Sequence, residues 1–452
     1  MSTKLFASKI GLVAATVGSA VGLGNIWRFP AEAQEGGGAA FLIVYIGCII
    51  LLGIPVMLSE FALGRAGRSD AIGSLRNTGA GKSWQAVGAW AILASYLILC
   101  FYMVVSGWAL EYFYQSITGS LFPIGNSNID LGVHYTNKMN ELISDSYNPL
   151  ISTFIVIALN IVILLGGVQK GIERLSNIAM PMLFVILVIL VGVSLSLPGA
   201  MDGVSFFLKP DFSKVTPLTI INATGQAFFS LSLGMGVLIT YASYFPKNTK
   251  LTRTALTVSM LDLSVSVMMG LIIFPAVTSF GLAGEGLRGA TLVFVTLPEV
   301  FASMPATQLW SILFFLLLAI AAITSTVSIA EVSIAFICEH FNVKRWKSAL
   351  IVLVPLFVFS SICSLSMGPW SDIKIAGLNI FDLLDTVATN IMLPIGSIFL
   401  CIYMGWRAPR KLFIEQLSNG GELKSAFYSI AIFIVRYVAP ILIAIMLIST
   451  FI

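Results

Sequence analysis

Long apolar stretches follow one another along nearly the whole chain, separated by short polar segments. A helix needs about 20 apolar residues to cross a bilayer, and each stretch is close to that length or longer. The pattern therefore predicts an all-α membrane protein with eleven transmembrane helices. Their expected positions are residues 10–34, 38–64, 86–117, 149–167, 173–197, 218–245, 252–282, 306–338, 348–367, 376–405 and 426–451.

The first of these spans is interrupted by the segment SAVGLGNIWRFP, which holds Gly22, Gly24, Asn25 and Arg28. Backbone N–H and C=O groups cannot remain unpaired in lipid, so a broken helix is tolerated only where it is buried in protein or lines a cavity. There the freed groups can bind ions and substrate. The segment favours a binding site built from the backbone, and a solute transporter is the leading interpretation.

A second interruption, SLSLGMG from Ser230 to Gly236, lies in the sixth span. It comes five spans after the first, as an inverted repeat of five plus five helices requires. We predict one transporter domain over residues 1–452, with repeats at about residues 10–197 and 218–405 and an extra helix at about 426–451. An alternative is that glycines in these helices only allow close packing, and we prefer that interpretation for Gly36–Gly38, Gly166–Gly167 and Gly270.

Composition supports a polytopic membrane protein, because 58% of the residues are hydrophobic and only 10% are charged. The five cysteines lie in or beside apolar runs and only two histidines occur, so neither a disulfide framework nor a catalytic or zinc site is indicated. Most basic residues fall in alternate loops, which the positive-inside rule assigns to the cytoplasm. The N-terminus is therefore expected in the cytoplasm and the C-terminus outside, in a multi-pass protein of the cell (inner or plasma) membrane.

Several segments together resemble the neurotransmitter:sodium symporters. GSAVGLGNIWRFP (residues 18–30) is similar to the first helix of that family, and GQAFFSLSLGMG (residues 225–236) with ITYASY is similar to the sixth. KGIERLSNIAMP (residues 170–181) resembles the start of the fifth helix and AAITSTVSI (residues 321–329) the eighth. The resemblance implies a sodium-coupled symporter, and eleven helices suggest a bacterial member that carries several hydrophobic amino acids.

The resemblance also implies two sodium ions. The first would be held by the Ala20 carbonyl and the side chains of Asn25, Ser230 and Asp262, with the substrate carboxylate completing the shell. The second would be held by the carbonyls of Gly18, Val21 and Ala321 and the hydroxyls of Thr324 and Ser325. For Thr324 and Ser325 the alternative is a hydroxyl that bonds back to the preceding helical turn.

Asp262 departs from the family pattern, which usually has an amide at this position. A carboxylate in mid-membrane costs at least about 2.5–3.5 kcal/mol unless it is paired, so it indicates function. We predict that Asp262 supplies the negative charge that chloride supplies in other members, so that chloride is not required. Ser266 lies one turn further on, where chloride-using members place a serine, and Asp262 could instead titrate and make transport proton-sensitive.

The substrate site implied by the resemblance combines charge recognition with an apolar pocket. Amide groups of Leu23 and Gly24 and the Tyr102 hydroxyl would bind a carboxylate. Gly22 stands where monoamine carriers have an aspartate, which favours a substrate with its own carboxylate. The remaining expected substrate contacts are Ala20, Ile98, Phe229, Ser230, Ser232, Met235, Ser325 and Ile329. For the apolar members the alternative is ordinary helix packing.

Gates and a release hinge complete the predicted site. Arg28 with Asp382, assisted by Gln226, would close the outer end, and Lys4 with Glu339 the inner end, where Phe6 would lie near Tyr244. Glu60 is expected to bond to the unwound backbone. Gly171 and Pro181 frame a part of the fifth helix that could unwind and let water reach the second sodium, although an ordinary helix start would look similar.

The leading interpretation is a symporter of Trp, Tyr, Phe, Leu, Ile and Val, and three other classes of function compete with it. A channel would need a continuous polar stripe, whereas the polar groups gather at one depth. A sodium-binding amino acid sensor and a proton-influenced carrier of other amino acids remain alternatives. A membrane enzyme would need a histidine or an acidic pair near the headgroup surface, and the two poorly placed histidines of this chain argue against that class. The expected partners are a small amino acid and membrane lipid, without nucleic acid; the sequence does not indicate an oligomeric state.

Overall fold

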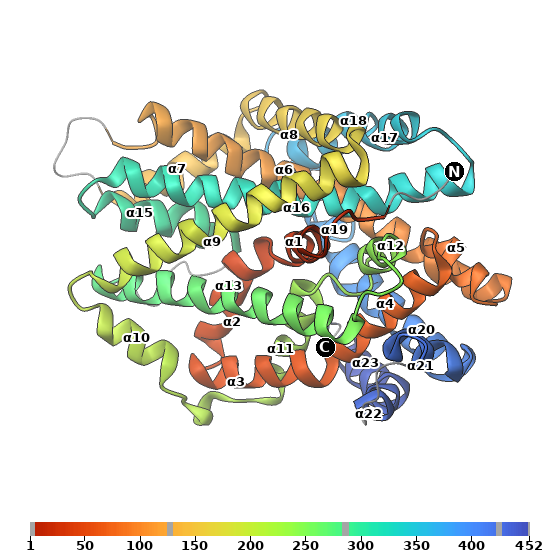
Figure 1. The fold of residues 1–452 in the computed structure, drawn as a ribbon. Coiled ribbons are helices and arrows are strands. Elements are labelled where there is room, and N and C mark those ends of the chain that lie inside the picture. The colour runs from red at the N-terminus through yellow and green to blue at the C-terminus, as the bar shows by residue number, and fades with distance from the viewer. Residues whose placement is uncertain (1–4, 124–129, 283–288, 422–426, 451–452) are drawn as a thin grey trace.

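The computed structural model describes residues 5–123, 130–282, 289–421 and 427–450. Within these ranges the chain forms helices and connecting segments, with a single isolated bridge between Ile375 and Leu378. Long helices such as α6, α9, α13 and α16 lie side by side through the body of the molecule, and the short helices α1, α2 and α12 lie among them (Figure 1). The predicted all-helical membrane fold is confirmed.

The first half of the chain supplies the first five spans. Its helices are α1 (Lys9–Ala20), η1 (Gly24–Arg28), α2 (Phe29–Glu35), α3 (Ala39–Cys48), η2 (Ile49–Gly53), α4 (Ile54–Gly67), α5 (Ala71–Asn77), α6 (Lys82–Thr118), α7 (Leu131–Ser144), α8 (Asn148–Leu165), η3 (Val168–Glu173) and α9 (Arg174–Leu195). The elements marked η in this half are π-helical turns inside longer helices, a form frequent at functional sites.

The second half supplies the sixth to tenth spans and one further helix. Its elements are α10 (Ala200–Leu208), η4 (Phe212–Lys214), α11 (Pro217–Ser230), α12 (Val237–Ser243), α13 (Leu251–Ser279), α14 (Gly289–Thr291), η5 (Leu292–Thr296), α15 (Leu297–Ala302), α16 (Thr307–His340), α17 (Arg345–Leu353), α18 (Leu356–Met367), α19 (Ile380–Asp385), η6 (Thr386–Met392), α20 (Leu393–Ile402), η7 (Tyr403–Arg407), α21 (Arg410–Ser418), α22 (Phe427–Phe433), η8 (Ile434–Val438) and α23 (Ala439–Ser449).

Nine helices of the described residues are long and apolar enough to cross a membrane, and the bent pair Lys9–Ala20 and Gly24–Glu35 makes a tenth span, with a bend of 54°. The sixth predicted span, residues 218–245, corresponds to α11 and α12. These two helices are short and are separated by the six residues Leu231–Gly236, so neither is a spanning helix by itself. Both predicted breaks therefore occur, five spans apart.

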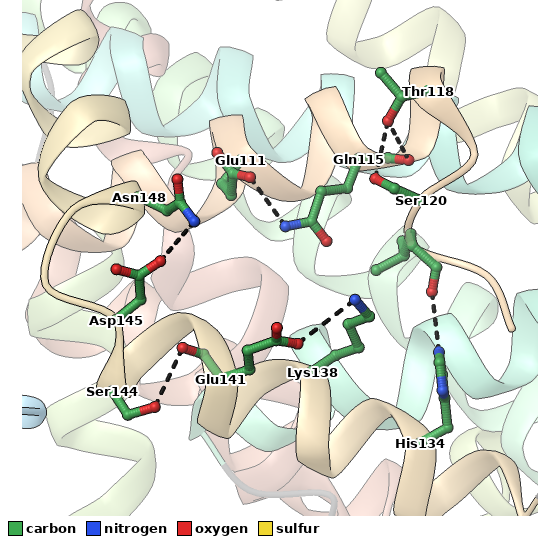
Figure 2. Close-up of polar contacts among 11 residues, drawn as sticks. Glu111, Gln115, Thr118, Ser120, His134, Lys138, Glu141, Ser144, Asp145 and Asn148 are labelled. Carbon is green, nitrogen blue, oxygen red and sulfur yellow. Dashed lines mark hydrogen bonds and ion pairs between the residues drawn. The ribbon is translucent and has the colours of Figure 1, made fainter.

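Short helices cover the end of the bundle that is expected to face outward. Figure 2 shows α7 beside the C-terminal part of α6, where a ring nitrogen of His134 lies 3.3 Å from the Leu121 carbonyl oxygen. Glu111 accepts hydrogen bonds from Gln115 (2.9 Å) and from Ser152 of α8 (2.8 Å). The His134 contact joins α7 to the segment that follows α6, the Ser152 bond joins α8 to α6, and α1 and α16 pack against each other.

Candidate functional site

The break in the first helix lies against two other spans. α1 ends at Ala20 and the chain becomes helical again at Gly24. Between them the Leu23 N–H donates to the hydroxyl of Tyr102 on α6 at 3.2 Å. A Cβ at Gly22 would lie 2.8 Å from both the Tyr102 hydroxyl and the Ser325 hydroxyl of α16. Only glycine allows this approach, and it brings three predicted substrate contacts together.

The break between α11 and α12 faces the break in the first helix. The Ser232 hydroxyl donates to the Ser19 carbonyl at 2.8 Å, and Ser232 itself has a φ of 53°. The Gly234 N–H donates to a carboxylate oxygen of Glu60 at 2.7 Å. Glu60 thus binds the unwound backbone as predicted, and these bonds satisfy groups that the interrupted helix leaves free.

Three of the four residues predicted for the first sodium, Asn25, Ser230 and Asp262, lie together around the Asp262 carboxylate of α13, which is completely buried. The Asn25 amide nitrogen lies 2.8 Å from the Asp262 carboxylate and 3.0 Å from the Ser230 hydroxyl, which in turn donates to Asp262 at 2.6 Å. Carboxylate, hydroxyl and amide oxygens are the ligands that hard cations prefer. The donor set around Asp262 fits a sodium ion.

Two further hydroxyls belong to this cluster. The Ser266 hydroxyl accepts from the Asn25 amide at 2.9 Å, and the Tyr45 hydroxyl of α3 lies 3.5 Å from Asp262. The sequence analysis missed Tyr45. Its one available signal was a phenol in an otherwise apolar stretch, and that signal does not reveal which helix the ring faces.

The residues predicted for the second sodium also lie together. The Ser325 hydroxyl is 3.1 Å from the Val21 carbonyl oxygen and 3.4 Å from that of Gly18. Thr324 instead donates to the carbonyls of Ile320 and Ala321 at 3.0 and 3.1 Å, which is the back-bonded alternative. Three carbonyls and two hydroxyls lie at this junction of α1 and α16, and this oxygen donor set also fits a sodium ion.

Apolar residues flank the breaks. Ile98 lies one helical turn before Tyr102 on α6, and Ile329 lies one turn after Ser325 on α16, so each pair shares a face. Ile98 and Ile329 are buried, as is Met235 in the second break. Phe229 packs on the first break, because a Cβ at Gly24 would lie 2.8 Å from its ring. The Leu23 N–H, the Tyr102 hydroxyl and buried apolar side chains therefore lie around the breaks.

The predicted outer pair, Arg28 with Asp382, is not formed in this structure. Arg28 lies 3.8 Å from Glu32 one turn along the same helix and over the Phe229 ring, with its guanidinium carbon 5.5 Å from the ring centroid. Asp382 is tied to Asn379 by two hydrogen bonds of 2.7 and 2.8 Å at the start of α19. This local cap holds the Asp382 carboxylate at its own helix end.

Gln226 also differs from its predicted role. Its amide nitrogen donates to the Gly24 carbonyl at 2.9 Å. It therefore supports the broken backbone of the first helix, whereas it was expected to hold Arg28.

The opposite end of the bundle is closed by aromatic and charged groups. Phe6 is 3% exposed, its N–H donates to the Tyr244 carbonyl at 3.1 Å, and its ring packs against Tyr241 and Tyr244. The Tyr244 hydroxyl donates to Glu331 at 2.7 Å, and Arg345 binds the same carboxylate through two nitrogens at 2.6 and 2.8 Å. Phe6 lies where the sequence predicted, whereas the Glu331–Arg345 pair was missed.

Lys4 of the predicted inner pair lies outside the described residues. Its expected partner Glu339 accepts hydrogen bonds from the Ser69 hydroxyl and the Asp70 N–H, both at 2.7 Å. Glu339 therefore already joins α16 to the start of α5.

The predicted release hinge is helical in this structure. Gly171 lies in η3 and Pro181 lies inside α9. Glu173, between them, accepts hydrogen bonds from the Ala7 N–H (2.8 Å) and from the N–H and hydroxyl of Ser8 (3.0 and 2.8 Å). The start of α9 is thus tied to the start of α1, a contact that the sequence pattern did not indicate.

A membrane bundle whose two broken helices face each other around buried oxygen ligands defines a secondary transporter. Comparison with known proteins agrees. The model of the sodium:neurotransmitter symporter family matches residues 3–128 and 127–452. The chain belongs to this family, whose members are transporters rather than enzymes, and it is a sodium-dependent symporter with multiple membrane-spanning helices.

Relatives match over almost the full length. An uncharacterized sodium-dependent transporter of Bacillus subtilis, YhdH, is 36% identical over 98% of this chain and 97% of its own. Another from Methanocaldococcus jannaschii, MJ1319, is 35% identical over 94% of this chain and 86% of its own. The crystal structure of MhsT in complex with L-phenylalanine aligns with a TM-score of 0.88 and 39% identity over 99% of both chains.

Proposed function

We propose that this protein moves hydrophobic and aromatic L-amino acids into the cell together with two sodium ions, by alternating access. The observation that carries the proposal is the meeting of the Gly22–Leu23 break with Tyr102 and Ser325, beside the Asp262 cluster. A substrate carboxylate placed there lies next to the first sodium site. Ion and solute then stabilise each other, which couples their movement.

The pocket favours large apolar side chains. Gly22 leaves no acidic group for an amine without a carboxylate, while Ile98, Met235 and Ile329 supply apolar walls. Met is flexible and adapts to different shapes, so one pocket accommodates Trp, Tyr, Phe, Leu, Ile and Val. The similarity to MhsT, whose structure holds L-phenylalanine, supports this substrate class.

Asp262 is the residue that we propose makes chloride unnecessary. Its carboxylate lies beside Asn25, Ser230 and Ser266 and supplies a fixed negative charge at the first sodium. Two sodium ions moving down a 100 mV potential contribute about 2.3 kcal/mol each. This driving force supports strong accumulation of a neutral amino acid.

The test is uptake of tritiated tryptophan and leucine into proteoliposomes with an imposed sodium gradient, with and without chloride. Wild type should accumulate both amino acids equally well in either anion. Asp262→Asn should lose most uptake in chloride-free medium and recover part of it when chloride is added. Ser264→Ala is the matched control and should behave as wild type, because Ser264 lies on the same helix and, among the described residues, its hydroxyl bonds only to the Leu261 carbonyl.

Three results would contradict parts of this proposal. Sodium-dependent binding without accumulation would replace the symporter by a sensor. Uptake that follows a pH gradient and is insensitive to sodium would favour the proton-influenced alternative. A wild type that needs chloride would show that Asp262 does not replace the anion.

A further inference from the structure

An open groove runs along the outer surface of the bundle between α8, the start of α9 and α16. It encloses about 370 Å³. Val162 of α8 and Ile178 of α9 form part of its wall and are 69% and 61% exposed, and Met182 and Ile323 continue the apolar surface. All three helices lie in candidate membrane spans. The groove therefore opens toward the bilayer.

Two cations stand at one end of this groove. Lys170 and Arg174 line it, both are exposed, and their spacing of four residues places them on one face of the helix. Neither forms an ion pair within the part of the chain that the structure describes. Charged side chains near a span end reach toward the headgroup layer, where anionic lipids supply the missing partners.

We propose that this groove binds one anionic phospholipid, with its phosphate on Lys170 and Arg174 and an acyl chain on the apolar wall. Charge complementarity selects the headgroup, and the long apolar surface selects a lipid over a free anion. Neutral phospholipids offer the same chain without the net charge, so they bind more weakly.

The site has a consequence for transport that rests on the proposed function. The same wall contains Gly171, Leu175 and Ala179, which belong to the segment framed by Gly171 and Pro181. Ile320 and Ile323 of the wall flank Ala321 of the second sodium site. A lipid packed here stabilises the helical form of the segment. Anionic lipid therefore slows the unwinding that lets water reach the second sodium site.

Native mass spectrometry of the purified full-length protein tests the binding step, with phosphatidylglycerol and phosphatidylcholine as probes. Two lysine- or arginine-type contacts to an anionic headgroup should favour phosphatidylglycerol by about thirtyfold. The double variant Lys170→Gln/Arg174→Gln should lose this preference. The double variant Lys250→Gln/Arg253→Gln removes two exposed basic residues at the start of α13 and should keep it.

A third variant, Val162→Trp, fills the apolar wall and keeps both cations. It should weaken phosphatidylglycerol binding as well; unchanged binding would show that surface charge alone attracts the lipid and would overturn the groove assignment. Inorganic phosphate should fail to displace the lipid at equal concentration. Full displacement would show that the site recognises only a free anion.

Hydrogen exchange of residues 168–181 reads out the effect on the hinge without measuring transport. Phosphatidylglycerol should slow exchange in wild type and leave the Lys170→Gln/Arg174→Gln variant unchanged. If uptake is absent and both lipid effects persist, the proposed function fails and the lipid site stands. Exchange that ignores the lipid would overturn the link to the hinge.

Discussion

Position 22 requires glycine because two side-chain hydroxyls lie too close to its Cα to leave room for a Cβ. Its backbone is not in the left-handed region, but the hydroxyls of Tyr102 and Ser325 approach so closely that any Cβ would collide with them. The residue therefore joins three helices at the point where a substrate carboxylate is expected. Gly24 is constrained in the same way by the Phe229 ring.

Gly22→Ala should weaken substrate binding while the fold persists. Overpacking of this kind costs about 1–3 kcal/mol, which corresponds to roughly a 5- to 150-fold rise in the dissociation constant. Equilibrium binding of radiolabelled leucine in sodium checks it. Gly47→Ala, in a span where nothing lies within 4 Å of the added methyl, is the control and should bind normally. Equal affinity of the two variants would remove Gly22 from the site.

At the scale of elements, proline and glycine set where helices bend, end or can open. Pro181 lies inside α9 and cannot donate to the Asn177 carbonyl one turn earlier, which weakens the helix at that point. Pro149 stands in the first turn of α8, where a missing N–H costs nothing. Two prolines in neighbouring spans therefore have different consequences.

Pro181→Ala should make α9 harder to unwind, since an interior proline costs about 3 kcal/mol relative to alanine. We expect turnover in proteoliposomes to fall about tenfold or more, with sodium-dependent substrate binding retained. Pro149→Ala should leave turnover unchanged. A Pro181→Ala protein that transports at the normal rate would exclude this segment as the release hinge.

The contact between α15 and the start of α7 carries a pH effect. Burial, followed by repulsion from Asp130, raises the pKa of the Glu299 carboxyl above its usual value. Because the folded state favours the protonated form, ionised Glu299 destabilises the fold, and this cost appears as pH rises through its pKa. The group lies outside the long spans, at the outer cap.

Glu299→Gln should therefore raise the melting temperature at pH 7 by about 1–2 °C, a small gain because the carboxylate is partly exposed to solvent. At pH 3, well below the ordinary glutamate pKa of about 4.3, the side chain is largely protonated in both states and the difference from wild type should vanish. Differential scanning fluorimetry in detergent at the two pH values measures both. A variant that is less stable at pH 7 would contradict the argument.

At the scale of the whole molecule, closure of one end depends on a buried ion pair. The Glu331 side chain is completely buried, and its carboxylate is held by Arg345 and by the Tyr244 hydroxyl beneath Phe6. Breaking such a pair costs about 3–5 kcal/mol, because the remaining charge stays buried without a partner. The closed arrangement of this end should therefore be sensitive to either residue.

Arg345→Gln should shift the population toward a state open at this end. Cys338 on α16 is the only cysteine of the five that is not buried, and its maleimide labelling should accelerate by at least about tenfold. Lys347→Gln, two residues away, should label as wild type. The double variant Glu331→Gln/Arg345→Gln removes both charges and should label more slowly than Arg345→Gln. Equal rates for all the proteins would refute the ion pair as a lock.

The fold was largely determined by local features of the sequence. Apolar length defines a span because the bilayer has a fixed thickness, and the glycine-rich segments at Gly22–Gly24 and Ser230–Gly236 cannot continue a helix. Both breaks and the helical fold could therefore be predicted, as could the bond between Glu60 and the unwound backbone. The family resemblance implied Asn25, Ser230 and Asp262 as sodium ligands, and these three residues lie together in the structure.

Tertiary structure alone decided which groups pair. Tyr45 faces Asp262, and Glu173 bonds to the segment before α1. Glu331 pairs with Arg345, although Lys344 is one residue nearer in the sequence. The same holds for Arg28, which lies on Glu32 and Phe229, while Asp382 is hydrogen-bonded to Asn379, the cap residue of its own helix. Spacing along a helix fixes the face on which a side chain lies, but its partner depends on helix rotation and depth. Those are set by the packing of all the spans together.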